Sequence, residues 1–391
     1  VVMTRIMFPY IGLISMVSLS AGILNTFVRF AIPAFTPVLL NLALIGGAVF
    51  LAPHLEQPIY ALSIGVLVGG VLQLAIQVPA LARLGLLPRV GLLPGAIKSA
   101  IHNPDARRVL KLMGPAVFAV SVAQISLIIN TNIASRLETG SVSWLSYADR
   151  LMEFPTALLG VALGTVLLPS LSKANARNDL AQAGELLIWG LQLTLLLAAP
   201  CAITLFIFGE PLAAVLYHYG KFNATDVLMT QRALAAYGVG LIGLILVKIL
   251  APGFYSRQDI RTPVKIGLVV LVATQLANLV FVPWLGHAGL ALSIGVGACL
   301  NAALLWVGLH RRGALPSSAW LKYLGQLLLA LIPFSGLLFY ASTAHQWLGL
   351  QETPWLRIGL LTGWLAAAAV IYFGALSLVG IRWQKFLRHA K

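Results

Sequence analysis

The chain has 391 residues, of which 59% are hydrophobic and only 9% are charged, and its mean hydropathy is +0.92. A soluble domain of this length needs far more polar residues to cover its surface, so the composition excludes a soluble globular protein and favours one that spans a membrane. The formal net charge of +15 first suggests a nucleic-acid partner. The placement of the basic residues points to membrane topology instead, and we expect no nucleic-acid role.

Apolar stretches alternate with short polar joints along the whole chain. Each stretch is long enough to cross a hydrocarbon core of about 30 Å, which predicts an all-α polytopic membrane protein with about 11 transmembrane helices. The predicted spans are 5–25, 34–52, 58–82, 112–133, 144–168, 184–208, 228–254, 264–283, 288–309, 321–341 and 356–380.

The basic residues collect in every second joint. One alternate set of joints, together with the C-terminal tail, holds 19 of the 26 Lys and Arg residues, whereas the other set holds three and the spans hold four. Basic residues are retained on the cytoplasmic side of membrane proteins. This distribution predicts a multi-pass membrane protein with its C-terminus in the cytoplasm and its basic joints next to anionic membrane lipids.

The chain contains an internal repeat. Residues 21–66 align without a gap on residues 251–296, with 11 identities in 46 positions and the shared run ALSIGV. Three spans precede the repeated segment in the later half and none in the earlier half. The repeat therefore predicts a chain that is truncated at its N-terminus and an intact protein of 14 helices in a 6+6+2 arrangement, with two lobes of the same orientation.

This arrangement predicts four regions. The first three helices close an N-lobe, a long basic joint links the lobes in the cytoplasm, six helices form a C-lobe, and a helix pair with a cytoplasmic tail ends the chain. Their boundaries are 1–82, 83–111, 112–312 and 313–391.

The span 144–168 carries the densest charge of any span. Asp149, Arg150 and Glu153 lie on one broad helix face, because residues three and four apart are neighbours on a helix. That face continues with small residues, namely Ala157, Gly160 and Gly164. Ionisable groups inside a membrane are expensive and usually line a polar path. The alternative is a self-neutralising cluster that docks two helices.

Other polar residues inside the spans carry weaker signals. Lys248 is deep enough to be a candidate cavity cation, with pairing to a backbone carbonyl as the alternative. Arg5 and Arg232 lie near outer helix ends, where long side chains reach the interface. We expect interhelical hydrogen bonds, rather than an ion site, from Asn130, Thr274, Gln275 and Asn278. Enzyme, metal-ligand and cofactor motifs are absent from the sequence, so we expect a transporter without a cofactor or metal.

Three segments carry a family resemblance. YADRLMEFP at 147–155, GTVLLPSLS at 164–172 and APGFYSRQDIRTP at 251–263 closely resemble the bacterial lipid II flippase family MurJ (MviN), of the multidrug/oligosaccharidyl-lipid/polysaccharide exporter superfamily. The resemblance implies translocation of lipid II, the undecaprenyl-pyrophosphate-linked peptidoglycan precursor, from the inner to the outer leaflet by alternating access. It further implies a multi-pass protein of the bacterial cytoplasmic (inner) membrane with a role in cell wall biogenesis and cell shape, and cell-wall synthesis proteins as candidate partners.

The resemblance also implies roles for particular residues. Arg150 matches the family's second-lobe arginine, which belongs to the cationic cavity that binds the pyrophosphate, and Asp149 and Glu153 match the adjacent acids. The terminal pair, 321–341 and 356–380, corresponds to helices that form a groove for the lipid tail. Two alternatives remain open: a drug or cation antiporter of the same superfamily, and a non-catalytic scaffold of the cell-wall machinery.

Overall fold

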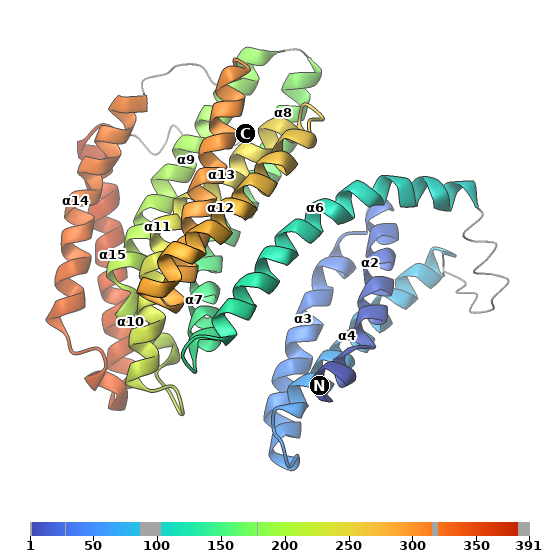
Figure 1. Ribbon diagram of the computed structural model, residues 1–391, viewed down its shortest axis with the longest axis horizontal. Coiled ribbons are helices and arrows are strands. Elements are labelled where there is room, and N and C mark those ends of the chain that lie inside the picture. Colours follow the sequence, from blue (N-terminus) through green and yellow to red (C-terminus); the bar gives the residue numbers. More distant parts are fainter. Residues whose placement is uncertain (1, 28, 87–102, 178, 315–319, 382–391) are drawn as a thin grey trace. The chain divides into compact units, whose positions relative to one another are not determined.

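The computed structural model describes residues 2–27, 29–86, 103–177, 179–314 and 320–381. Within these ranges the regular structure is helical (Figure 1). The chain divides into two compact units, Val1–Val109 and Leu110–Lys391. The predicted all-α polytopic membrane fold is confirmed.

Unit 1 is built from helices that cover α4 (Tyr60–Arg83). The others are α1 (Val2–Met7), α2 (Tyr10–Thr26), α3 (Ala31–Gly46), η1 (Gly47–Leu51) and η2 (Ala52–His54). A Cβ on Gly65 of α4 would lie 3.0 Å from the carbonyl oxygen of Ala43. The missing side chain therefore lets α3 and α4 approach closely, as small residues do between membrane helices.

Unit 2 contains the remaining elements. In chain order they are α6 (Pro104–Ser135), α7 (Ser141–Pro155), η3 (Thr156–Val161), α8 (Ala162–Ala176), α9 (Leu180–Ile207), α10 (Gly209–Tyr217), α11 (Ala224–Tyr255), α12 (Arg261–Leu285), α13 (His287–Arg311), α14 (Trp320–Ala344), η4 (Gly349–Glu352) and α15 (Pro354–Leu378). The first of these helices, α6, begins in unit 1 and crosses the division between the units.

Helix α11 is the most buried long helix of unit 2 and packs against α7, α8, α9, α10 and α13. Its closest approach is to α13. A Cβ on Gly240 would overlap the backbone of Gly295, and one on Gly243 would lie 2.6 Å from the backbone nitrogen of Cys299. Glycine at both positions lets the two backbones touch, so a larger residue would push the helices apart.

Nine of the eleven predicted spans correspond to helices in the described ranges that are long and apolar enough to cross a membrane. The other two, 112–133 and 144–168, fall on α6 and on the run α7–η3–α8. They are helical but do not belong to those nine, so the count of about eleven stays a prediction. The sequence missed the short helix α10, whose nine residues do not reach across a bilayer. Most of the predicted joint 83–111 lies outside the described residues.

Proline interrupts several helices, and polar side chains repair two of the breaks. Proline lacks an N–H group, so the carbonyl four residues earlier loses its usual donor. Pro37 frees the carbonyl of Pro33, which accepts a hydrogen bond of 2.8 Å from the Thr36 hydroxyl. Such repair is what makes a proline tolerable in a membrane helix.

The second repair holds the terminal helix pair to the rest of unit 2. Pro200 frees the carbonyl of Leu196 in α9, and the Tyr372 hydroxyl on α15 donates to that oxygen at 2.6 Å. The hydroxyl of Tyr323 on α14 donates to the Gln192 carbonyl one turn earlier, also at 2.6 Å. Both helices of the pair are therefore fixed to the same side of α9.

At its other end the pair is fixed by a buried arginine. Arg357, in the first turn of α15, is fully buried and donates to the carbonyl of His218 at 3.5 Å. Its guanidinium carbon lies 5.0 Å from the centre of the Tyr219 ring. The cation thus lies beyond the C-terminal end of α10, where the helix dipole favours positive charge.

We expect Tyr372→Phe to lower the stability of the protein by about 1–2 kcal/mol, because it leaves the freed Leu196 carbonyl without a donor in an apolar core. In a Pro200→Ala background the new backbone N–H donates to that carbonyl, so Tyr372→Phe should lower the stability by less. Thermal unfolding in detergent of both single variants and the double variant measures the coupling. Tyr340→Phe, at an exposed position of α14, is the control. An equal cost in both backgrounds would contradict the repair.

Candidate functional site: a polar stripe along α7, η3 and α8

The charged span forms a continuous helical run in which α7, η3 and α8 follow one another. The run begins after Gly140, whose φ of 110° lies in the left-handed region that favours glycine. Near this start, the indole N–H of Trp144 donates to the Asp226 carboxylate at 2.8 Å. Asp226 belongs to the capping box of α11, so the start of α7 is fixed to the start of α11.

Arg150 and Glu153 are exposed on this run. Their side chains are 79% and 67% accessible, and the closest nitrogen and oxygen atoms are 3.9 Å apart. An ion pair with this geometry and exposure is weak. The guanidinium of Arg150 is therefore held near Glu153 and still has most of its donors free for an anion.

Asp149 points a different way from its two neighbours. It is half-buried, and its carboxylate interacts with the hydroxyl of Tyr237, a buried residue of α11. The structure thus divides the expected trio: Asp149 joins α7 to α11, while Arg150 and Glu153 remain available on the surface of the unit.

A π-helical turn, η3, follows these charged residues in the chain. It begins at Thr156, after Pro155, and the Thr156 hydroxyl donates to the Met152 carbonyl at 2.9 Å. Proline clashes with the carbonyl four residues earlier, and a wider turn with i→i+5 bonds accommodates the misfit. Single π turns often lie at functional sites because they re-aim the side chains on either side.

Lys248 lies against the same run, at a different level. It is exposed, and its stem covers Gly160, where a Cβ would lie 2.5 Å from the lysine Cδ. Gly160 follows Arg150 by ten residues, which corresponds to about 15 Å along a helix. Lys248 therefore does not join the Arg150 cluster. It provides a second positive charge further along the same face of the run. We call this face the polar stripe; it carries Arg150, Glu153, Ala157, Gly160 and Gly164.

Three of the polar residues expected to hydrogen-bond between helices do so between α6 and α12. The Asn130 side-chain oxygen accepts from Asn278 at 2.9 Å and from Gln275 at 3.5 Å, and Asn278 also donates to Gln275 at 3.0 Å. The expected interhelical hydrogen bonds are confirmed for these three residues. Thr274 lies apart from them, against Gly297 of α13.

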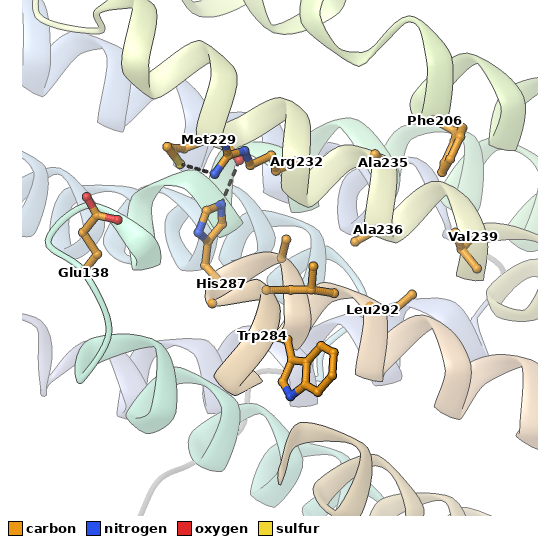
Figure 2. A pocket seen from close by; sticks show the side chains of 13 residues that line it. Glu138, Phe206, Met229, Arg232, Ala235, Ala236, Val239, Trp284, His287 and Leu292 are labelled. Carbon is orange, nitrogen blue, oxygen red and sulfur yellow. Dashed lines mark hydrogen bonds between the residues drawn. The ribbon is translucent and has the colours of Figure 1, made fainter. Parts of the chain in front are cut away.

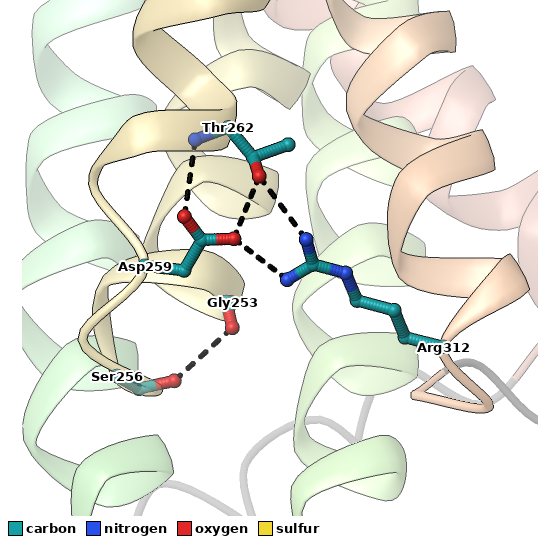
Figure 3. A network of polar contacts seen from close by, with 5 residues as sticks. All are labelled: Gly253, Ser256, Asp259, Thr262 and Arg312. Carbon is teal, nitrogen blue, oxygen red and sulfur yellow. Dashed lines mark hydrogen bonds and ion pairs between the residues drawn. The ribbon is translucent and has the colours of Figure 1, made fainter.

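A charged network that the sequence did not predict lies at the α11–α12 joint, inside the third family-like segment (Figure 3). Asp259 accepts hydrogen bonds from the backbone N–H of Thr262 at 3.0 Å and from its hydroxyl at 2.7 Å. Arg312, which follows α13, reaches the same carboxylate at 2.7 Å and the Thr262 hydroxyl at 3.1 Å. The network fixes the start of α12 to the end of α13. The partners are 53 residues apart in the chain, so spacing alone gives no signal.

Comparison with known proteins agrees with the arrangement of helices and with the segments that carry the site. A sequence model of the family described as lipid II flippase MurJ matches residues 1–357. The chain is 57% identical over 392 residues to the lipid II flippase MurJ of Burkholderia cenocepacia, and the alignment covers all of this chain and 75% of that protein.

The chain belongs to the lipid II flippase MurJ family.

Two further comparisons agree with this assignment, one in sequence and one in fold. A probable lipid II flippase MurJ of Vibrio cholerae is 38% identical, with 97% of this chain and 71% of that protein aligned. A solved structure, described as lipid II flippase MurJ in an inward closed conformation, superposes with a TM-score of 0.76 at 23% identity. It covers 96% of this chain and 73% of that one, and at this identity it bears on the fold alone. The family expected from the three sequence segments is confirmed.

The network at Asp259 makes stability depend on pH. Hydrogen bonds from Thr262, followed by the guanidinium of Arg312, lower the pKa of Asp259 from its usual 3.8 to about 2. Since the unfolded chain keeps the usual value, the network stabilises the folded protein above about pH 4 and loses that effect as the pH falls towards 2.

We therefore expect Asp259→Asn to lower the unfolding temperature in detergent at about pH 7, and the gap to the wild type to shrink at about pH 3. Asparagine keeps a side-chain oxygen that can accept from the Thr262 N–H, so the difference reports the charge. Glu352→Gln, a change at an exposed carboxylate in η4, serves as the control. A gap that stays constant across this pH range would show that Asp259 acts through shape and not through its charge.

Proposed function

We propose that this protein translocates lipid II from the inner to the outer leaflet of the bacterial inner membrane by alternating access, as a secondary-type transporter and not an enzyme. The observation that carries the proposal is the exposed Arg150 on a polar stripe inside an otherwise apolar helical protein of the MurJ family. A pyrophosphate bearing sugars does not cross hydrocarbon unaided, so it needs a cationic polar surface such as this one.

Arg150 is the residue that we propose binds the pyrophosphate. A guanidinium presents planar donors that match two phosphate oxygens at once, and it keeps its charge at any physiological pH. Glu153, at 3.9 Å, restrains the side chain without occupying its donors, and Asp149 fixes the helix to α11. These two acids are positioning groups in the proposal, and neither contacts the phosphate.

Lys248 provides the next positive charge along the stripe. Its stem lies flat on Gly160, and Gly164 leaves space beside the Lys248 carbonyl. The two cations are separated by about 15 Å along the helix. We propose that the anionic headgroup passes from one to the other as the cavity changes the side to which it opens.

The division into lobes supports a rocking mechanism. The proposed lobes are 1–82 and 112–312, with the basic joint 83–111 between them and the pair 313–391 at the end. The concentration of basic residues in alternate joints supports a cytoplasmic position for that linker and for the C-terminus. An inside-negative potential then favours outward movement of an anion, by about 2.3 kcal/mol per charge per 100 mV.

We expect Arg150→Ala to abolish support of growth in cells depleted of their own lipid II flippase, and Arg150→Lys to restore it only in part, because lysine is a single point charge without the planar fork. The intact protein and its variants are compared at matched membrane levels, with lipid II exposure on the outer leaflet as the direct readout. Arg177→Ala, at an exposed arginine beyond the end of α8, is the control.

The same experiment separates the alternatives. A scaffold of the cell-wall machinery would tolerate the loss of Arg150 as well as that of Arg177. A drug or cation antiporter would leave lipid II facing inward with the wild-type protein too. Flipping by Arg150→Ala at the wild-type rate would exclude Arg150 as the pyrophosphate-binding residue.

Lys248→Met should slow lipid II exposure without abolishing it, since it removes one of two cations and keeps the apolar stem over Gly160. Lys248→Arg should retain most of the rate because it keeps the charge. The initial rate of lipid II labelling in spheroplasts measures both variants. A wild-type rate for Lys248→Met would remove this residue from the transport path.

A further inference from the structure

A polar pocket and an apolar groove meet at one end of unit 2. The pocket has a volume of about 620 Å³ and is bordered by α11 and by the joint between α12 and α13. The groove has a volume of about 450 Å³ and runs between α9, α11 and α14. Phe206 and Val239 line both, so the two cavities adjoin at these side chains, with charged residues beside the first and only apolar residues around the second.

The pocket holds two opposite charges that do not neutralise each other. Arg232 is exposed, and its guanidinium donates to the sulfur of Met229 at 3.8 Å, a weak acceptor. Glu138 borders the same pocket from the α6–α7 joint, and among the described residues the salt bridges include neither of these two. Figure 2 shows Arg232 above His287, whose ring is fixed by a 2.8 Å hydrogen bond to the Met229 carbonyl, with Glu138 to one side.

The border of the pocket has the composition of a membrane–water interface. Trp284, at the end of α12, borders it and is 88% exposed. Exposed tryptophans at helix ends are typical of the interfacial aromatic belt. The α12–α13 joint is on the opposite side from the basic α11–α12 joint, which corresponds to the outer leaflet in the proposed orientation.

The groove has the length of one leaflet. Along α9 its lining extends from Leu195 to Ile207, which is about 18 Å of helix. This is about half of the 30 Å hydrocarbon core. The remaining lining is apolar, with Leu327, Leu328 and Leu331 contributed by α14. Such a groove fits a fatty acyl chain, which ends near the midplane, better than a polyprenyl chain, which is much longer than a leaflet.

We infer that the pocket and the groove together bind a zwitterionic glycerophospholipid that carries both a phosphate and a primary ammonium group. The phosphate binds Arg232, the ammonium group pairs with Glu138, and one acyl chain lies in the groove beside Phe206 and Val239. A lipid with a phosphate alone leaves Glu138 without a partner and next to a like charge. The site is separate from the polar stripe and does not rest on the proposed transport of lipid II.

Native mass spectrometry of the purified intact protein tests this site. Phosphatidylethanolamine, phosphatidylglycerol and a polyprenyl phosphate are titrated separately, and we expect phosphatidylethanolamine to bind most tightly. Arg232→Gln should weaken the binding of both phospholipids by about tenfold, because it removes a charged hydrogen bond to phosphate. Glu138→Gln should weaken the binding of phosphatidylethanolamine alone and so remove the preference for it over phosphatidylglycerol. Val239→Trp should weaken the binding of both phospholipids by filling the place where the pocket and the groove adjoin.

Arg136→Gln is the matched control, since Arg136 is exposed two residues from Glu138 and lines neither cavity. Gel-filtration profiles equal to that of the wild type show that each variant is folded. Equal binding of phosphatidylethanolamine by Arg232→Gln and the wild type would overturn the site. Tighter binding of the polyprenyl phosphate, with the same dependence on Arg232, would overturn the assignment of the lipid.

Discussion

The close contact between α11 and α13 is the constraint on which the rest of unit 2 depends. Gly240 meets the backbone of Gly295, so α11 is enclosed by its neighbours along most of its length. Membrane helices gain little from the hydrophobic effect and associate through such packing. With α11 fixed, its side chains hold other elements: Tyr237 meets Asp149 of α7, and the Lys248 stem covers Gly160. The polar stripe is thus positioned by α11, which contacts it at Gly160 and Gly164.

Proline and polar side chains act together in this fold. A bilayer supplies no water to a freed carbonyl, so each proline inside a helix needs a local remedy. Tyr372 supplies a donor from another helix at Pro200, and a π turn widens the helix after Pro155. The first remedy ties the terminal pair to α9, and the second lies within the polar stripe and includes Gly160.

The helices could be predicted from sequence because twenty-residue apolar runs have few alternatives in a membrane. Asp149, Arg150 and Glu153 could be found because charge inside a span is rare. The different directions of these side chains could not be predicted, because Asp149 turns towards Tyr237, a partner remote in the chain. The Asp259 network and the short helix α10 were missed for similar reasons: the first joins distant segments, and the second has no span-length apolar run.

The central claim is that the polar stripe faces water within the membrane. Cysteine labelling tests it directly in a variant that lacks Cys201 and Cys299. The account predicts that a membrane-impermeant thiol reagent labels Ala157→Cys, which lies on the stripe, and spares Leu158→Cys, which is 59% exposed but lies off the stripe. Equal protection of both positions in cells that still flip lipid II would show that the stripe is dry, and the proposed path for the pyrophosphate would be wrong.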